Sequence, residues 1–247
     1  MSASVPAIRA SDLGQSFGPR NIYRHVSFNV AQGEVFVVLG GSGSGKSTLL
    51  RQLIGLLAPR EGTVEILGDD LYRGGARVLN RIGVMFQSGA LFGSMTLLEN
   101  VMLPLEMHTD LPPRARAEVA RMKLGSVGLV DAVGLLPAEI SGGMTKRAAI
   151  ARALALDPPL LFLDEPSAGL DPATSAGLDQ LILNLRQDLG TTFVVVTHEL
   201  ASILAIADRC IMLDKTARGV IAEGDPRQLR DASDNPTVQH FFRREAA

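Results

Sequence analysis

A glycine-rich loop between an apolar strand and a helix constrains the fold of this chain more than any other feature of its sequence. The loop, Gly40-Gly-Ser-Gly-Ser-Gly-Lys46-Ser47, fits the pattern GxxxxGK[ST]. It directly follows the run 34–39, which is apolar on both faces and therefore predicts a strand buried within a sheet. The residues after the loop, 48–57, have the pattern of a helix. Strand, loop and helix in this order predict a phosphate-binding loop.

The residue types of this loop suit a polyphosphate chain. Glycines leave the backbone N–H groups free to surround the phosphates, and the start of the following helix adds its dipole. Lys46 supplies positive charge for the β- and γ-phosphate oxygens, and the Ser47 hydroxyl is a compact ligand for Mg²⁺. The alternative is a glycine-rich turn that binds nothing, which the spacing and the flanking strand and helix argue against.

The rest of the chain alternates between strand and helix patterns, with one interruption. The first ninety residues predict strands and turns with one helix, the strands falling at 8–17, 27–30 and 64–67. From about residue 90 to residue 140 the strand signal disappears, and residues 112–130 predict a helix opened by two prolines. Alternation then resumes with strands at 160–163 and 192–196 and helices at 175–188 and 199–207. This pattern predicts a mostly parallel sheet covered on both faces, with a helical insertion.

Composition excludes several classes of protein. The 24 Lys and Arg residues against 26 Asp and Glu give a net charge of -2, which leaves no basic excess for nucleic acid. No apolar run is long enough to span a membrane, and the first residues lack the apolar core of a signal peptide, so we expect a soluble cytoplasmic protein. Cys210 is the single cysteine and is expected to be buried and without a function.

Two acidic residues follow the predicted strand at 160–163. Asp164 and Glu165 would lie at the carboxyl edge of the sheet, where open α/β folds bind their ligands. Successive strand residues point in opposite directions, so we expect one carboxylate to reach the Mg²⁺ shell and the other to act as general base on the attacking water. Taken alone, such a pair is more often a helix cap or a solvated turn.

A second helix start also carries the features of an anion site. The segment Ser141-Gly-Gly-Met-Thr145 opens the helical run 146–156, with small residues that leave backbone N–H groups free. The chain has one phosphate loop with a lysine but two such helix starts. Either a second ligand binds here or two chains share each nucleotide, and sharing requires a symmetric dimer.

The order of these motifs resembles the nucleotide-binding domain of ABC transporters over nearly the whole chain. The phosphate loop, Gln87, ISGGM, LLFLDEP, GLDP and VTHE occur in that family's order. The resemblance implies that Gln87 links Mg²⁺ to the helical subdomain, that ISGGM is the signature motif and that Asp171 lies in the dimer-contact loop. It likewise implies that His198 is the switch histidine and that Phe17 stacks on adenine.

This resemblance implies a complete set of expectations. The fold would be α/β, a P-loop NTPase with a RecA-like core, an N-terminal antiparallel β subdomain and a helical insertion. The chain would form one domain over 1–247, with 1–89 and 156–247 as the core and 90–155 as the helical subdomain. The ligands would be ATP and Mg²⁺. The expected catalytic residues are Glu165, His198, Lys46 and Gln87, and the expected metal ligands are Ser47, Gln87 and Asp164. The expected nucleotide-binding residues are Phe17, Gly40, Gly41, Ser42, Gly43, Ser44, Gly45, Lys46, Ser47, Thr48, Ser141, Gly142, Gly143 and Asp171.

Two positions depart from the family pattern. The signature ends in Met144 where glutamine is usual, and the phosphate loop has Gly41 where proline is common. Neither change removes a phosphate donor, so we expect the reaction to be preserved and only its fine geometry to differ.

Within the family, four segments resemble the ATPase of Mla/MCE phospholipid transport systems: FQSGALF, ENVMLPLEMHTDLP, SGGMTKRAAIARALALDP and NPTVQHFF. This implies an ATPase peripheral to a bacterial inner membrane, on its cytoplasmic face, with a permease, a second copy of itself, a STAS-domain subunit and an MCE lipid-binding protein. The alternatives are another ABC transporter, a soluble ABC protein acting on DNA or ribosomes, and a catalytically dead cassette. A single cassette without heptads or a basic patch argues against the soluble protein. Glu165 and His198 argue against the dead cassette.

The apolar segment 88–98 has two interpretations that the sequence leaves open. Leu91, Phe92, Met95 and Leu98 either pack the junction of the helical insertion or line a groove for a cytoplasmic helix of the permease.

Overall fold

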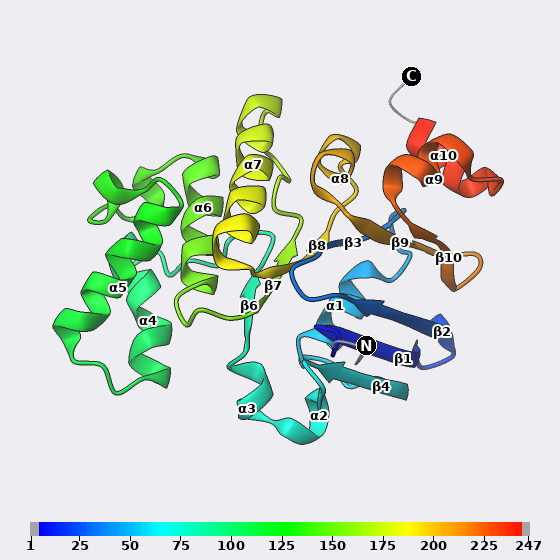
Figure 1. Cartoon of the computed structure of the whole chain (residues 1–247), viewed down its shortest axis with the longest axis horizontal. Helices are drawn as coiled ribbons and strands as arrows, with labels where there is room; N and C mark the ends of the chain where they lie inside the picture. Colours follow the sequence, from blue (N-terminus) through cyan, green and yellow to red (C-terminus); the bar gives the residue numbers. More distant parts are fainter. Residues whose placement is uncertain (1–4, 244–247) are drawn as a thin grey trace.

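The computed structural model describes residues 5–243, in which two β-sheets pack against one helix between them (Figure 1). The smaller sheet is antiparallel and four-stranded, in the order β2-β1-β4-β5. Its strands are β1 (Ile8–Phe17), β2 (Arg20–Val30), β4 (Glu61–Ile66) and β5 (Asp69–Asp70). Helix α1 (Lys46–Leu53) buries Leu49, Leu50 and Leu53 in a cluster that contains residues of both sheets.

The larger sheet has six strands in the order β10-β9-β3-β8-β7-β6. Its strands are β3 (Val35–Gly40), β6 (Ile82–Met85), β7 (Leu160–Asp164), β8 (Thr192–Val196), β9 (Arg209–Asp214) and β10 (Gly219–Gly224). All neighbouring pairs are parallel except β9 and β10. The carboxyl ends of β3, β7 and β8 therefore meet at one edge of the sheet, as expected for a ligand site.

Strand β3 shows why its sequence is apolar on both faces. On one face of β3, Val35, Val37 and Leu39 belong to the core that the later helices of the chain, from residue 97 on, cover. On the other face, Phe36 and Val38 belong to the core shared with α1 and the antiparallel sheet. Successive side chains of a strand point to opposite faces, so a strand covered on both sides needs apolar residues throughout.

Three helices form the helical insertion at one end of the molecule, far from the antiparallel sheet (Figure 1). They are α4 (Leu97–His108), α5 (Pro113–Ser126) and α6 (Gly142–Ala153). Helix α4 begins with a capping box, in which Thr96 Oγ accepts from the Glu99 N–H and the Glu99 carboxylate accepts from the Thr96 N–H. Helix α5 begins at Pro113, a position that proline tolerates because its missing N–H would have no partner.

Four further helices of the described range 5–243 follow strands of the larger sheet. They are α7 (Pro172–Leu189), α8 (Leu200–Ile206), α9 (Pro226–Ala232) and α10 (Pro236–Phe242), with short 3₁₀ turns at Val130–Ala132 and Pro137–Glu139. No helix in the described range 5–243 is both long and apolar enough to cross a bilayer.

Some element predictions were wrong in detail. The first ninety residues contain α2 (Leu71–Gly74) and α3 (Ala76–Leu79) in addition to α1, and α2 begins at a cap formed by Asp70. Strand β2 begins seven residues before position 27, because irregular pairing with β1 lets its polar first half remain in the sheet. The helix expected at 112–130 ends at Ser126, just before Gly128 with a φ of 76°.

Candidate functional site

The loop between β3 and α1 requires glycine at two of its positions. Gly40 has a φ of 148°, and a Cβ there would lie 2.3 Å from the carbonyl oxygen of Leu213. Gly45 has a φ of 103°, and a Cβ there would lie 2.9 Å from the ring of Tyr23. Side chains at these positions would both strain the backbone and collide with neighbouring strands. The loop therefore keeps its N–H groups free of covering side chains.

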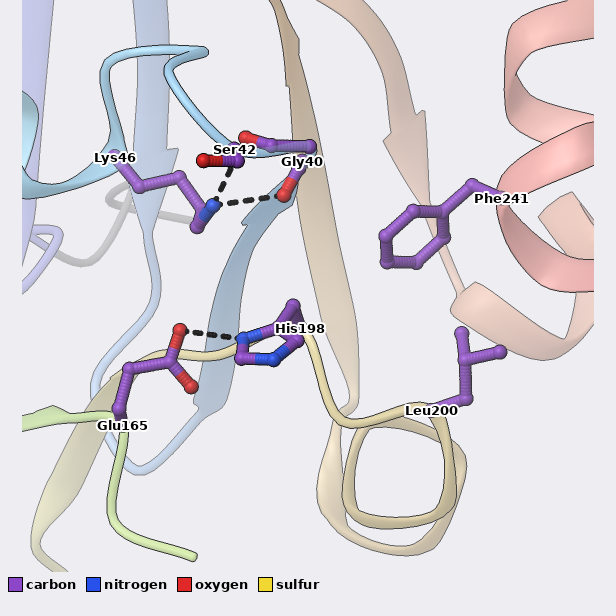
Figure 2. Close-up of a pocket in the computed structure, with 8 residues that line it drawn as sticks. Gly40, Ser42, Lys46, Glu165, His198, Leu200 and Phe241 are labelled. Atoms are coloured by element: carbon purple, nitrogen blue, oxygen red, sulfur yellow. Dashed lines mark hydrogen bonds and ion pairs between the residues drawn. The ribbon is translucent and has the colours of Figure 1, made fainter. Parts of the chain in front are cut away.

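Lys46 lies across the mouth of this loop. Its Nζ donates to the carbonyl oxygens of Gly40, at 2.7 Å, and Gly41, at 3.1 Å (Figure 2). Burial lowers the pKa of the Lys46 ammonium, and the carboxylates of Glu165 and Asp164 oppose that shift. The Lys46 ammonium group therefore lies at the loop, within electrostatic reach of the Asp164 and Glu165 carboxylates.

Ser44 shows that the loop fits an additional ligand. Its hydroxyl is buried and has no hydrogen-bond partner within residues 5–243. A buried polar atom without a partner is costly, so such atoms commonly mark the place of a ligand or an ordered water. A loop with free N–H groups, one cation and one unpaired hydroxyl has the donor set that a polyphosphate requires.

Glu165 adopts an unusual backbone conformation at the end of β7. Its φ is 46°, in the left-handed region, and its N–H donates to the carbonyl oxygen of Val196 at 2.8 Å. Its Oε1 lies 2.7 Å from Nδ1 of His198, which follows β8 (Figure 2). Because an ionised carboxylate can only accept, Nδ1 of His198 carries the proton in this contact. Burial, followed by the neighbouring Glu165 carboxylate, raises the pKa of Asp164.

These groups surround a pocket of about 500 Å³. Residues from β3, the phosphate loop and the segments after β7 and β8 line it together with two apolar residues from further along the chain: Gly40, Gly41, Ser42, Lys46, Glu165, His198, Leu200 and Phe241. Sequence reasoning missed Leu200 and Phe241. Figure 2 shows both on the side of the pocket opposite Lys46 and Glu165, where they form an apolar wall. Leu200 begins α8, two residues after His198, and Phe241 comes from α10, which reaches this place only through the fold.

Phe17 lies beside a second pocket of about 310 Å³ on the other side of the phosphate loop. Its ring is 49 % exposed, which is high for a residue of its size and leaves a face open for stacking. Arg20, Ile22 and loop residues complete the lining: Gly43, Ser44, Gly45, Lys46, Ser47 and Thr48. The structure thus brings Phe17 together with the expected phosphate ligands.

Gln87 lies in the loop after β6. Gln87 and Asp164 line an open pocket of about 580 Å³ together with Phe86, Ser88 and Gly169. The expected metal ligands Gln87 and Asp164 therefore share one space, and Ser47 lies at the start of α1.

The signature segment lies apart from these pockets. Ser141 caps α6, its Oγ accepting from the Met144 N–H at 3.3 Å, and Ser141 and Gly142 are exposed. Neither pocket at the phosphate loop is lined by residues 141–143. Asp171 caps α7 through the N–H groups of Ala173 and Thr174, and hydrogen bonds to Thr174 lower its pKa. The starts of α6 and α7 lie side by side, since a Cβ on Gly143 would lie 2.5 Å from Thr174.

Lys146 is a third residue that sequence reasoning missed. It lies one turn into α6, is 7 % exposed, and its Nζ donates to the carbonyl oxygens of Gln87 and Glu165. The available signal was a lysine on the helix face that also carries Ala149 and Ile150, both buried. A charge on a buried face needs partners, and here the partners belong to the candidate site.

In the apolar segment 88–98, some side chains pack in the core and one is exposed, as a partner surface would require. Leu91 and Leu98 pack against the core, and Met95 is half-buried, whereas Phe92 is 53 % exposed. Asn100 holds the backbone of Phe92, accepting from its N–H at 2.8 Å and donating to its carbonyl at 3.1 Å. The phenyl ring is consequently presented outward on an ordered backbone.

The sequence is similar to those of ABC transporter proteins. The family model described as ABC transporter matches residues 23–168. The chain is 41 % identical over 240 residues to the probable ribonucleotide transport ATP-binding protein mkl of Mycobacterium leprae, covering 96 % of this chain and 68 % of that protein. It is 40 % identical over 236 residues to the intermembrane phospholipid transport system ATP-binding protein MlaF of Haemophilus influenzae, covering 94 % and 89 %.

Two solved structures share the fold. The cbiO1 protein of Clostridium perfringens, described as part of an ABC transporter complex, superimposes with a TM-score of 0.84 at 26 % identity, covering 93 % of this chain and 92 % of that one. A bacterial ABC transporter cassette solved as a dimer superimposes with a TM-score of 0.78 at 32 % identity, covering 88 % and 98 %. The predicted α/β P-loop NTPase fold is confirmed.

Proposed function

The chain belongs to the ABC transporter family as an ATP-binding subunit, and from this premise we propose that it hydrolyses ATP to move phospholipid across a bacterial inner membrane. The observation that carries the ATPase chemistry is the convergence of Lys46, Glu165 and His198 on one pocket. The names and identities of the relatives support the choice of lipid.

In the proposed reaction each residue acts through the geometry described above. Lys46 neutralises charge on the β- and γ-phosphates. Glu165 accepts a proton from the attacking water, and His198 fixes the carboxylate through its Nδ1–H. The ring of Phe17 stacks on the nucleotide base. Leu200 and Phe241 give the pocket an apolar wall opposite Lys46 and Glu165.

The residues around Lys46 also suit Mg²⁺. A serine hydroxyl, a carboxylate and an amide oxygen, from Ser47, Asp164 and Gln87, are hard oxygen ligands of the kind this ion prefers. Bound there, Mg²⁺ would neutralise charge on the phosphate oxygens. Burial and the Glu165 carboxylate raise the pKa of Asp164, and a cation bound beside this carboxylate would oppose both effects.

We infer that two copies of the chain share each nucleotide. The Ser141 segment has the exposed backbone of an anion site but lies outside both pockets at the phosphate loop. In a two-fold dimer, this segment of one copy would cover the nucleotide held by Lys46 of the other. Asp171, at the neighbouring start of α7, would then lie close to the contact between the copies.

The division into a core (1–89 and 156–247) and a helical subdomain (90–155) is part of this proposal. The helical subdomain would meet a permease on the cytoplasmic face of the membrane, with Gln87 joining it to the nucleotide. The exposed Phe92 on its ordered backbone suits a groove for a short permease helix. A STAS-domain subunit and an MCE lipid-binding protein are the further partners that this assignment implies.

The test for the membrane partner is a charge at Phe92. In Phe92→Glu, the isolated subunit should stay folded and bind ATP while losing its permease in pull-downs. Met107→Glu, at another exposed apolar residue of the same subdomain, is the matched control and should retain the permease. If Phe92→Glu captures the permease as well as the unaltered chain does, Phe92 is not part of the permease contact.

The test for the transported molecule is lipid transfer by the intact complex. The complex, purified with its permease and placed in proteoliposomes, should move a labelled phospholipid on addition of ATP, and the Glu165→Gln complex should not. Movement of a ribonucleotide instead of lipid would favour the function that the mycobacterial relatives' name gives. Recovery of ribosomes or DNA in place of a permease would favour a soluble ABC protein.

A further inference from the structure

Lys146 is a buried cation that the proposed reaction does not use. It belongs to α6, the helix that begins at the signature segment, yet its side chain leaves the helical layer and ends among the loops of the larger sheet. The residue is 7 % exposed, and burial lowers the pKa of its ammonium while Asp164 and Glu165 oppose that shift. Its contacts must offset the loss of hydration.

These contacts lie on two different loops. Nζ donates to the carbonyl oxygen of Gln87, in the loop after β6, and to that of Glu165, after β7, at 3.4 Å. Strands β6 and β7 are parallel neighbours, so both loops leave the same edge of the sheet. One ammonium group therefore joins the start of α6 to both loops that face Asp164.

The contact with Glu165 falls on a strained residue. A φ of 46° is unfavourable for a side chain without the local hydrogen bonding of Asn or Asp, and such conformations persist where surrounding contacts fix them. The Glu165 N–H is held by Val196, and its carbonyl oxygen accepts from the Ala168 N–H at 3.2 Å and from Lys146. Of the three residues that bond to the Glu165 backbone in these contacts, Val196, Ala168 and Lys146, Lys146 comes from the helical insertion.

We propose that Lys146 is a positioning residue for ATP hydrolysis, which fixes the loops of Gln87 and Glu165 relative to the signature helix. The inference rests on the proposed roles of Gln87 and Glu165. Because the same helix presents Ser141 at its exposed start, engagement of Ser141 by the partner copy's nucleotide would be transmitted to Glu165 through one side chain. The effect belongs to the chemical step, since Lys146 does not line the pockets beside Lys46 or Phe17.

Three variants test this inference. Lys146→Met keeps about the length of the side chain and removes the ammonium group that makes both hydrogen bonds, whereas Lys146→Gln keeps a neutral donor. Lys123→Met is the matched control, because Lys123 is also a poorly exposed lysine of the helical insertion but pairs with Asp157. We expect Lys146→Met to lower kcat by roughly tenfold or more, with KM for ATP changed by less than about threefold. Lys146→Gln should fall between Lys146→Met and the unaltered chain, and Lys123→Met should keep its kcat.

Several outcomes would overturn the inference. A kcat for Lys146→Met within about twofold of the unaltered chain would do so. So would a loss of kcat and of thermal stability that Lys123→Met reproduces in the same proportion, because that result indicates a purely structural role. If Lys146→Met does not fold, Lys146→Gln carries the test: its kcat should drop by roughly threefold or more at constant KM, and an unchanged kcat overturns the proposal.

Glu165→Gln, measured in parallel, separates this inference from the proposed function. If Glu165→Gln is inactive while Lys146→Met is normal, the inference fails and the proposed function stands. If Glu165→Gln itself turns over normally, the assignment of the base fails, whatever Lys146→Met shows.

Discussion

The two helix starts at α1 and α6 carry similar sequences but have different surroundings. The start of α1 is enclosed by its own chain: Lys46 bonds to the loop, and Glu165 and His198 face it across a pocket. The start of α6 is capped by the Ser141 hydroxyl and exposed, and its glycines lie beside Leu170 and Thr174, around the start of α7. Both have backbone N–H groups at a helix start, but Lys46 and Glu165 line a pocket at the start of α1, whereas the lysine of α6, Lys146, is buried and donates to the backbone carbonyls of Gln87 and Glu165.

The difference shows how one chain can carry an incomplete site. Under the proposed sharing of each nucleotide, this chain builds one side of the site around Lys46 and presents the other at Ser141, outside the pockets at the phosphate loop. A symmetric pair of chains supplies both sides twice. The comparison predicts large effects for changes around α1 and specific, dimer-dependent effects for changes at α6.

The largest effect is expected at Lys46. Lys46→Ala removes the cation of the phosphate loop and its charge-assisted hydrogen bonds, so ATP binding should weaken and turnover should fall by roughly a thousandfold. Nucleotide affinity by calorimetry and phosphate release measure the two effects. Near-normal turnover in this variant would show that the α1 start is not the catalytic one.

Glu165→Gln should separate binding from chemistry. An amide cannot accept the proton of the attacking water, so turnover should fall by roughly a hundredfold, while Lys46 still binds the phosphates and Asp164 remains as the expected Mg²⁺ ligand. Removing one negative charge also lessens repulsion of the triphosphate, so ATP should stabilise a dimer visible by light scattering. Hydrolysis at the unaltered rate would exclude Glu165 as the base.

The smallest effect is expected at Asp179, which joins α7 to α8. This buried carboxylate on α7 accepts from Ser202 on α8 at 2.8 Å, and burial raises its pKa. A raised folded-state pKa means that stability is lost as pH rises through that pKa, because the folded chain must then hold a buried charge. Asp179→Asn keeps an acceptor for Ser202 without the charge. Its unfolding temperature should exceed that of the unaltered chain by a few degrees at pH 7, and the gap should close at roughly pH 4. A gap that is constant with pH would contradict this account.

The sequence predicted the parts of the site that depend on neighbouring residues. The glycines at 40 and 45, Lys46, and the acidic pair after β7 are local features, and the structure places them at one sheet edge because parallel strands end together. Cys210 is buried as expected, and burial raises the pKa of its thiol to about 12.

The features that the sequence did not predict depend on distant contacts. Strand β6 is only four residues long and is recognisable through its pairing with β7. Phe241 reaches the pocket from α10, two hundred residues after the phosphate loop, and Lys146 finds partners on loops at 87 and 165. Such contacts have no local pattern, since side-chain packing and not sequence spacing brings the residues together.

Cross-linking between the two helix starts tests the shared site most directly. Ser42→Cys and Ser141→Cys, placed together in a Cys210→Ala background, put one thiol at the phosphate loop and one at the signature segment. With ATP, oxidation should give a disulfide-linked dimer on a non-reducing gel, and chains with either cysteine alone should give much less. Cross-linking within one chain only, or dimer formation that does not depend on ATP, would contradict the account that two copies share each nucleotide.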